Sequence, residues 1–446
     1  MPYWDRLRAQ AEHLELWMDL AKEQGADLAP IEDQVREFLA RTAARVRELP
    51  PRPGYPYEEP DELEAIRALR REGPRRLPLD LTDDELHDRI LGAWLGRSAG
   101  CVLGVPVEGR DRSFIEAWAR KLGQPYPLAE YWADYPGVPH LHYSEPIDDF
   151  VKGKIDHTGP DDDIVYTVLG LLILEEYGPD FTTEDIGRAW LRYLPMACTA
   201  ESVALENLRK GLVPPETALS RNPYSEWIGA DIRSDAWGYA APGLPELAAE
   251  FAYRDARLSH TRNGIYGEMF FSAATACAFS VRAVREALET ALTEIPATSR
   301  MAETVRETMQ WVGADRDWDR TWQRITERYA GMSSVHTLNN AAHTISALLY
   351  SEGSFERAIS LAVMAGLDVD CTGATTGSIM GALLGAAKLP AKWVEPLGDR
   401  LTTYLIGREE QSVSDLARRT TEIAKLCRGR LSGCRGCRTH PRTITS

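Results

Sequence analysis

The stretch GATTGSIMGALLGAA, residues 373–387, places a glycine at every fourth position, at Gly373, Gly377, Gly381 and Gly385. Residues four apart lie on one face of an α-helix, so this spacing predicts a helix with one stripe free of side chains. Each glycine inside a helix costs about 1 kcal/mol of stability relative to alanine. Four of them on one stripe therefore indicate that another backbone or a ligand comes very close to this face.

A second stretch, LGAWLGRSAGCVLG at residues 91–104, repeats this spacing near the other end of the chain. Thr82 and Glu85 form a capping box in front of it, which predicts a helix from this point to about Leu103. The sequence therefore predicts two buried helices, each with a smooth face. The glycines of the second stretch are Gly92, Gly96, Gly100 and Gly104.

The segments between these two stretches predict further helices rather than strands. Apolar residues fill nearly all of the segments 164–177, 269–281 and 354–366, and helices buried on every side belong to the centre of a large bundle. No sustained alternation of apolar and polar residues bounded by hairpin turns is found in the sequence. Stretches 105–160 and 212–245 are predicted to be long loops. We therefore expect one all-α domain over residues 81–420.

Composition and charge narrow the class of protein. The chain has 446 residues, of which 44% are hydrophobic and 26% charged, as in ordinary globular proteins. Its formal net charge is −16, which argues against nucleic acid or an anionic membrane as a partner. The N-terminus carries charges from the start and no 18 apolar residues run together, so we expect a cytoplasmic protein.

Proline residues divide the chain in front of the main domain. Residues 1–48 are predicted to form an accessory hairpin of two amphipathic helices. Residues 49–80 begin with a cluster of prolines and are predicted to be a linker and lead-in. Residues 421–446 are predicted to be a basic, flexible tail. The alternative for this tail is a small zinc site built from Cys427, Cys434, Cys437 and His440.

Three adjacent acids, Asp161, Asp162 and Asp163, stand directly before the apolar segment 164–177. One acid is enough to cap the N-terminus of a helix. Three carboxylates where a buried helix begins repel one another unless a cation is present. Helix capping is the alternative interpretation, but a metal site explains all three acids.

A second acidic group, GLDVDCTG at residues 366–373, precedes the glycine stripe. In a turn, Asp368 and Asp370 point the same way, and Thr372 adds a hydroxyl oxygen. Ligand sets made only of oxygen suit Mg²⁺, Mn²⁺ or Ca²⁺ better than zinc. Glu108, directly after the first glycine helix, is a third candidate, with a solvated loop acid as the alternative interpretation.

Several blocks of the chain, together covering about residues 85–390, resemble the ADP-ribosylglycohydrolase family. The resemblance implies an all-α orthogonal multi-helix bundle of the ADP-ribosylglycohydrolase type, here with an N-terminal helical extension. The blocks are DRILGAWLGRSAGCVLGVPVEG (88–109), GPDDDIVYTVLGLLILEEYG (159–178), GADIRSDAWGYAAPG (229–243), RLSHTRNGIYGEMF (257–270), HTLNNAAH (336–343) and VMAGLDVDCTGATTGSIMGALLGA (363–386).

The resemblance further implies two divalent ions, Mg²⁺ or Mn²⁺, at one end of the bundle. Family members hold them with a Thr-Asp-Asp-Thr and an Asp-Thr-Asp-Thr element. By position, residues 161–163 occupy the first element, Asp368 and Asp370 occupy the second, and Glu108 matches the family glutamate that lies over the metals.

The implied substrate is ADP-ribose, free or linked to a protein. Gly229, Ala230 and Arg233 match the family loop beside the substrate diphosphate, and His260 matches a histidine at the substrate site. Small residues let backbone N–H groups approach an anion, and Arg233 adds a positive charge. Asp231 in the same loop adds a negative charge, which a diphosphate disfavours.

Two departures from the family pattern leave alternatives open. Pro160 and Asp163 stand where the family has threonines around its acid pair, so the register is open by one residue. Cys371 replaces the last threonine of the second element, so the number of ions, one or two, is open too.

The expected activity is metal-dependent hydrolysis of the glycosidic bond at the anomeric carbon of an ADP-ribosyl group. Glu108 or Asp370 is expected to position or deprotonate the attacking water. One alternative is a hydrolase or transferase acting on another N-glycoside. A catalytically silent protein that binds ADP-ribose is the other, because a fold does not by itself imply a function.

Overall fold

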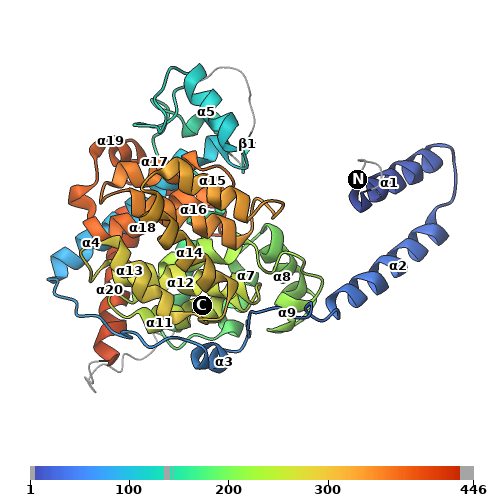
Figure 1. The fold of residues 1–446 in the computed structure, drawn as a ribbon, viewed down its shortest axis with the longest axis horizontal. Helices are drawn as coiled ribbons and strands as arrows, with labels where there is room; N and C mark the ends of the chain where they lie inside the picture. Colours follow the sequence, from blue (N-terminus) through green and yellow to red (C-terminus); the bar gives the residue numbers. More distant parts are fainter. Residues whose placement is uncertain (1–5, 135–140, 144, 432–446) are drawn as a thin grey trace. The chain divides into compact units, whose positions relative to one another are not determined.

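The computed structural model describes residues 6–134, 141–143 and 145–431. The protein is 65% helical, and within the described residues its only sheets are two pairs of two-residue antiparallel strands. In these pairs Leu141 lies opposite Pro146 and Leu401 lies opposite Gln411. The predicted all-α fold is confirmed (Figure 1).

The elements follow one another along the chain as helices joined by connections of different lengths, the longest of them between Lys121 and Asp162. The helices are α1 (Leu7–Glu23), α2 (Ala29–Arg47), α3 (Leu63–Ala68), α4 (Asp83–Gly104), α5 (Arg112–Lys121), α6 (Asp162–Tyr177), α7 (Thr183–Tyr193), α8 (Thr199–Arg209), α9 (Glu216–Leu219), α10 (Ser234–Ala240), α11 (Pro245–Ala256), α12 (Asn263–Ala278), α13 (Val284–Ala291), α14 (Arg300–Asp315), α15 (Trp318–Arg328), α16 (Thr337–Tyr350), α17 (Phe355–Met364), α18 (Val369–Leu384), α19 (Ala391–Val394) and α20 (Val413–Leu431). The strands are β1 (Leu141–His142), β2 (Glu145–Pro146), β3 (Leu401–Thr402) and β4 (Glu410–Gln411).

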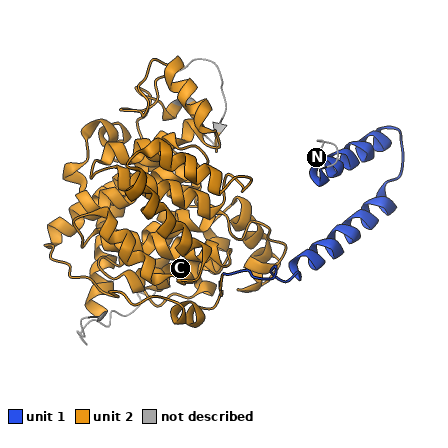
Figure 2. Cartoon of the chain, in the orientation of Figure 1, with its two compact units in different colours: residues 1–56 blue, residues 57–446 orange. Residues whose placement is uncertain are grey.

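The chain forms two compact units, residues 1–56 and residues 57–446 (Figure 2). In the first unit, α1 and α2 enclose an apolar groove of about 650 Å³. Leu14 and Met18 of α1 and Val35 and Phe38 of α2 line this groove. The apolar stripes of the two helices therefore face the same space within the first unit.

Residues 57–80, part of the predicted linker and lead-in over 49–80, belong to the main unit. The Glu59 carboxylate is buried and forms an ion pair with Arg300 at 3.0 Å. Ile66 of α3 is fully buried. The predicted start of the tail at residue 421 also falls inside a helix, because α20 continues to Leu431. Of the four residues of the alternative zinc site, only Cys427 lies within the described residues, where it is buried.

The two glycine-striped helices, α4 and α18, pack against each other more extensively than any other pair of helices in the described residues. A Cβ atom at Gly92 would lie 2.6 Å from the carbonyl oxygen of Gly381, and one at Gly373 would lie 2.6 Å from that of Gly100. These contacts pair the start of one helix with the end of the other, so the helices are antiparallel. The glycines are required because the two backbones touch along the whole stripe.

This antiparallel pairing determines where the site forms. The C-terminal end of α4, at Gly104, lies against the backbone of Asp370 at the N-terminal end of α18. The α4 helix begins with the predicted capping box, in which Thr82 and Glu85 bond reciprocally. It is long and apolar enough to cross a membrane by composition, but 83% of the relevant window is buried inside the protein, as expected of a core helix.

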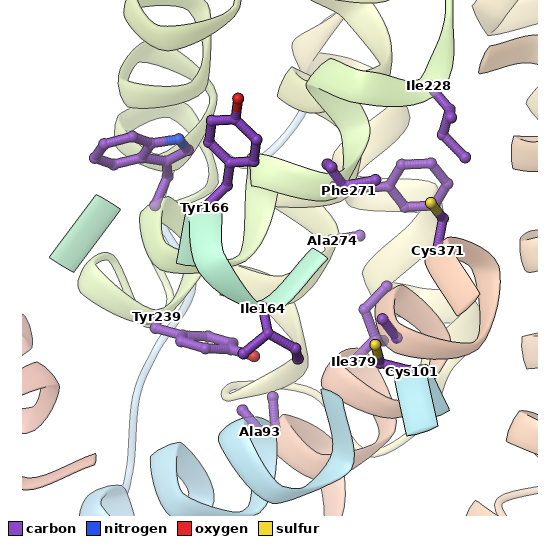
Figure 3. Close-up of a cluster of buried hydrophobic side chains, with 14 of the residues drawn as sticks. Ala93, Cys101, Ile164, Tyr166, Ile228, Tyr239, Phe271, Ala274, Cys371 and Ile379 are labelled. Atoms are coloured by element: carbon purple, nitrogen blue, oxygen red, sulfur yellow. The ribbon is translucent and has the colours of Figure 1, made fainter. Parts of the chain in front are cut away.

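The core around this pair is built from helices buried along their length, chiefly α6, α10 and α12. Figure 3 shows part of it, with Ile164 of α6, Tyr239 of α10, Phe271 of α12 and Ile379 of α18 among the labelled side chains. The stretch 212–245, predicted as a loop, contains α9, a 3-10 helix at Ile228–Arg233 and the buried α10. Short helices carry too few residues to show a clear periodicity.

Candidate active site

The first acidic group forms the N-terminus of α6. Asp161 is the N-cap residue, and its carboxylate accepts a hydrogen bond of 2.8 Å from the backbone N–H of Asp163. Asp161 and Asp163 are fully buried, and Asp162 is partly buried. The capping interpretation is therefore correct for Asp161, but it leaves two further carboxyl groups at the same helix end.

A buried arginine on α4 positions this helix end. The Arg97 guanidinium lies 3.1 Å from Asp163 Oδ1 and 2.5 Å from Asp235 Oδ2, and it donates to the Asp163 carbonyl oxygen. It also donates to the carbonyl oxygen of Ile232 at 2.6 Å. The sequence analysis missed Arg97, although a charged residue between glycines of a buried helix is a signal that an acid must lie opposite.

The second acidic group forms the N-terminus of α18, where Asp368 and Asp370 are both buried. Glu108 follows the 3-10 turn that ends α4, and the backbones of the two segments are bonded together. Gly109 N–H donates to the Leu367 carbonyl oxygen at 3.0 Å, and Leu367 N–H donates to that of Arg110 at 3.2 Å. As a result, one oxygen each from Glu108, Asp368 and Asp370 lie within 4.8 Å of one another.

Both groups border one cavity of about 130 Å³. Five acidic residues line it, and none of the described lining residues is a lysine or arginine. The cavity is therefore strongly negative unless cations compensate the charge. The lining residues are Glu108, Tyr143, Asp162, Cys198, Thr199, Glu201, Trp227, Ile228, Gly229, Ile232, Val335, Asp368, Asp370 and Cys371.

His142 of β1 lies between Asp161 and Glu108. Its Nε2 lies 2.8 Å from Asp161 Oδ2, and its Nδ1 lies 3.9 Å from Glu108 Oε2. Burial alone lowers the pKa of His142, but the hydrogen bond to Asp161 and the neighbouring carboxylates outweigh burial and raise the pKa. Sequence reasoning missed His142 because it lies in an irregular segment with no periodic signal.

The carboxyl groups hold their protons more strongly than ordinary acids. Burial, followed by repulsion from neighbouring acids, raises the pKa values of Asp162, Asp163 and Asp370 well above the usual range. The same two causes raise the pKa of Glu108 to about 7. The Glu108 side chain nevertheless keeps 47% of its surface exposed, so it stands at the mouth of the cavity.

The oxygen atoms of the two groups fit a divalent cation. Asp163 Oδ2, Asp370 Oδ1 and Thr372 Oγ1 are buried and have no hydrogen-bond partner in the described part of the chain. Unpaired buried oxygens are costly unless a ligand satisfies them. Carboxylate oxygens are the donors that Mg²⁺ and Mn²⁺ take. Thr372 is fully buried and does not line the cavity.

Of the four predicted substrate residues, only Gly229 lines the cavity. A Cβ atom at Gly229 would overlap the Glu201 carboxylate, so this glycine makes room for an acid of the protein. Ala230 is fully buried. The His260 ring is also buried and contacts Ser259 Oγ through Nδ1 at 2.8 Å.

The predicted role of Arg233 in binding a diphosphate does not fit its position. Its guanidinium is buried and lies 2.5 Å from Glu201 Oε1, 2.6 Å from Asp255 Oδ2 and 3.5 Å from Glu268 Oε2. Three carboxylates from α8, α11 and α12 therefore already share its charge. The sequence could not reveal this, since the partners are distant along the chain.

Asp231, whose negative charge is expected to disfavour an anion in this loop, is hydrogen-bonded to α16 instead of lining the cavity. Its Oδ2 accepts a hydrogen bond of 2.5 Å from the Thr337 hydroxyl. Burial raises its pKa well above the usual range. The loop itself is held to the start of α16 by a hydrogen bond of 2.9 Å from Ile228 N–H to the Val335 carbonyl oxygen.

The lining residues that were not predicted from the sequence include Tyr143, Cys198, Glu201 and Trp227. Tyr143 follows β1, Cys198 and Glu201 stand at the start of α8, and Trp227 precedes the 3-10 helix of the 229–233 loop. They come from three separate segments of the chain. No spacing within the sequence links them.

Fold and site together define a class: an all-α protein in which two helix N-termini and one helix C-terminus bring buried acids to a single cavity. The model of the ADP-ribosylglycohydrolase family matches residues 82–429. The chain belongs to the ADP-ribosylglycohydrolase family, and the helices α1 to α3 precede the matched region.

The chain is also similar to a solved structure described as an ADP-ribosylglycohydrolase-related protein complex. The two sequences are 22% identical, the similarity covers 77% of this chain and 99% of that chain, and the TM-score is 0.49. No curated protein matches this chain.

Proposed function

We propose that the protein is a hydrolase that depends on Mg²⁺ or Mn²⁺ and cleaves the glycosidic bond at the anomeric carbon of an ADP-ribosyl group. The observation that carries this proposal is the meeting of Glu108 with the acids of α6 and α18 at one cavity, in a chain of this family. The negative charge gathered there requires cations.

Asp161, Asp162, Asp163, Asp368 and Asp370 are the residues that would hold the ions. A bound divalent ion would orient ribose hydroxyls and make a water molecule more acidic. Such an ion needs carboxylates that are held in place. Arg97 fixes the N-terminus of α6, and the glycine contact with α4 fixes the N-terminus of α18.

Glu108 is the residue that we assign to proton transfer. In the metal-free protein, burial and the neighbouring carboxylates raise the pKa of Glu108 to about 7, and a divalent ion bound beside it would lower this pKa. The half-exposed position of Glu108 at the cavity mouth lets it reach a water molecule or the leaving group. Asp370 is buried on the floor of the cavity, and its negative charge favours the oxocarbenium-like transition state of glycoside cleavage.

The cavity suits a single sugar rather than the whole of ADP-ribose. Its volume of about 130 Å³ is smaller than the roughly 300–1,000 Å³ of typical pockets for larger ligands. We therefore place the ribose inside and the remainder of ADP-ribose outside, beside Trp227 and Tyr143 at its edge.

The test is release of ADP-ribose from ADP-ribosyl-arginine, ADP-ribosyl-serine and O-acetyl-ADP-ribose, with Mg²⁺ or Mn²⁺ present. We expect turnover of at least one of these substrates, and none with EDTA or with the Asp162→Asn and Asp370→Asn variants. No turnover of any of them by protein shown to bind metal would contradict the proposal.

A second candidate is hydrolysis of an N-glycoside that lacks a diphosphate. The observation that favours it is the absence of a lysine or arginine among the described lining residues, together with the burial of Arg233. Calorimetry with ADP-ribose, adenosine and ribose, with metal present, separates the candidates. If adenosine or ribose binds as tightly as ADP-ribose, the second candidate replaces the first.

A further inference from the structure

One cysteine shares the floor of the cavity with the acids. Cys371 Sγ lies within 4.8 Å of a carboxylate oxygen of Asp163 and of one of Asp370. These three residues are 5%, 0% and 2% exposed, respectively. With bond lengths like those of zinc to sulfur and oxygen, about 2.3 and 2.1 Å, small side-chain shifts bring all three atoms onto one ion.

Each of the two acids in this group has an oxygen to offer. Arg97 occupies Oδ1 of Asp163, while Oδ2 is buried without a hydrogen-bond partner in the described residues. Asp370 Oδ1 is equally buried and unpaired. These unpaired oxygens beside the sulfur indicate that the group binds a ligand with positive charge.

The position of Cys371 makes it accessible to such an ion. Cys371 lines the same cavity as Asp370. Its other side borders the core, where Figure 3 labels it with Phe271 and Ile379. The sulfur of Cys371 therefore lies where an ion in the cavity can reach it.

We infer that Cys371 is a direct metal ligand, and that with Asp163 and Asp370 it forms a mixed sulfur and oxygen site that prefers Mn²⁺ and softer first-row ions over Mg²⁺. The thiol binds as a thiolate, and its proton passes to solvent. Thiolate is a soft ligand that favours transition ions, while Mg²⁺ takes oxygen ligands. The inference deepens the proposed function, because it concerns the same metal centre.

Co²⁺ is the spectroscopic probe for this ligand, because a thiolate bound to Co²⁺ gives a charge-transfer absorption in the near ultraviolet. The full chain is used with Cys434 and Cys437 replaced by serine, so that the tail thiols do not contribute. We expect the band in this protein and in its Cys198→Ser variant, and its loss in the Cys371→Ser variant. Cys198 is the matched control because it lines the same cavity. Absence of the band, or its persistence in the Cys371→Ser variant, would overturn the inference.

X-ray absorption at the zinc edge identifies the atoms bound to zinc in the protein with Cys434 and Cys437 replaced by serine. Because no residue of the cavity is changed, the result does not depend on whether a cavity variant folds. We expect one sulfur neighbour at about 2.3 Å among oxygen neighbours. A shell that contains oxygen or nitrogen only would overturn the inference.

Metal preference gives a third readout. Mn²⁺ should raise the melting temperature more than Mg²⁺ at equal concentration, and Cys371→Thr should reduce this difference. Equal stabilisation by both ions would count against the inference. These experiments distinguish failure of this inference from failure of the proposed function. A cobalt–sulfur band without turnover refutes the hydrolase activity alone. Turnover with Mg²⁺ and no sulfur ligand refutes the Cys371 assignment alone.

Discussion

Glu108 differs from the other acids of the site in its surroundings. It keeps 47% of its side chain exposed, whereas Asp161 and Asp163 have no exposed surface. We propose the buried, neighbouring carboxylates as ligands, because either a proton or a cation must compensate their charge. A carboxyl group that reaches solvent at the cavity mouth can exchange a proton with water or substrate. The two kinds of acid therefore have different expected roles.

We predict that Glu108→Gln lowers the rate of the chemical step by about 10² to 10⁴-fold, the usual contribution of a general acid or base. Because the buried acids remain, the Kd for Mn²⁺ should change little. Single-turnover kinetics and equilibrium binding of Mn²⁺ measure the two effects. Glu116→Gln on the exposed face of α5 is the control. A wild-type rate for Glu108→Gln would show that the assignment is wrong.

A pH dependence follows from the raised pKa values of Asp162, Asp163, Asp370 and Glu108. From about pH 4 upward, the ordinary range of a carboxyl pKa, the metal-free folded state binds more protons at these groups than the unfolded chain does, and for Glu108 this window ends near pH 7. Their contribution to stability is therefore lost as the pH rises through this window. A bound cation reverses the preference, so it should stabilise the protein more at pH 8 than at pH 5.

The measurement is the melting temperature with EDTA and with Mn²⁺ at both pH values. Titratable groups outside the site behave the same with EDTA and with Mn²⁺. The difference between the melting temperatures in EDTA and in Mn²⁺ therefore reports on the site alone. The stabilisation follows RT ln(1 + [L]/Kd), and Asp370→Asn should reduce it. An Mn²⁺-induced shift of equal size at pH 5 and pH 8 would contradict the electrostatic argument.

At the scale of elements, the glycine spacing lets the backbones of α4 and α18 touch, and this contact positions the acidic residues of the site. Gly100 faces Gly373, and Gly104 faces Asp370. A side chain added at any of these glycines would push the two helices apart and move Glu108 away from the acids of α18. The glycines thus act on function through packing.

We predict that Gly100→Ala destabilises the protein by about 1–3 kcal/mol, because the added methyl group overlaps the carbonyl oxygen of Gly373. The affinity for Mn²⁺ should fall as well. Gly313→Ala is the matched control, since no atom lies within 4 Å of a Cβ atom at this helical glycine. It should stabilise the protein by up to about 1 kcal/mol. Urea unfolding measures both, and a neutral Gly100→Ala would refute the close contact.

How far the sequence predicts these elements depends on how local each signal is. The glycine stripe and the capping box of α4 are local patterns, and the structure has both. Arg233 is different, because its position depends on Glu201, Asp255 and Glu268 from three other helices. A sequence shows that an arginine is present, but not which distant carboxylates neutralise it.

At the scale of the whole molecule, the main unit begins earlier than the proline pattern suggests. Prolines near residue 56 end the first unit, but the segment after them is anchored by long-range ion pairs. Arg70 and Arg75 lie 2.5 and 2.8 Å from the carboxylate of Glu294, which is fully buried. A composition rich in proline predicts an extended chain, and it cannot show that such a chain lies against a protein surface.

We predict that a chain beginning at Tyr57 keeps the unfolding midpoint and the Mn²⁺ affinity of the full protein, since the acidic groups all lie in the second unit. A chain beginning at Asp80 leaves the Glu294 charge buried without its two arginines, which costs about 3–5 kcal/mol. Adding Glu294→Gln to the shorter chain should restore part of the loss. Equal midpoints for both truncations would contradict this boundary.

The central claim is that the acids of α6 and α18 form one divalent-metal centre. The most direct test is anomalous X-ray diffraction at the manganese edge from crystals grown with saturating Mn²⁺. The account predicts one or two anomalous peaks within bonding distance, about 2.0–2.3 Å, of carboxylate oxygens from both Asp161–Asp163 and Asp368–Asp370. Peaks bonded to only one group, or no peak in the cavity, would contradict the claim.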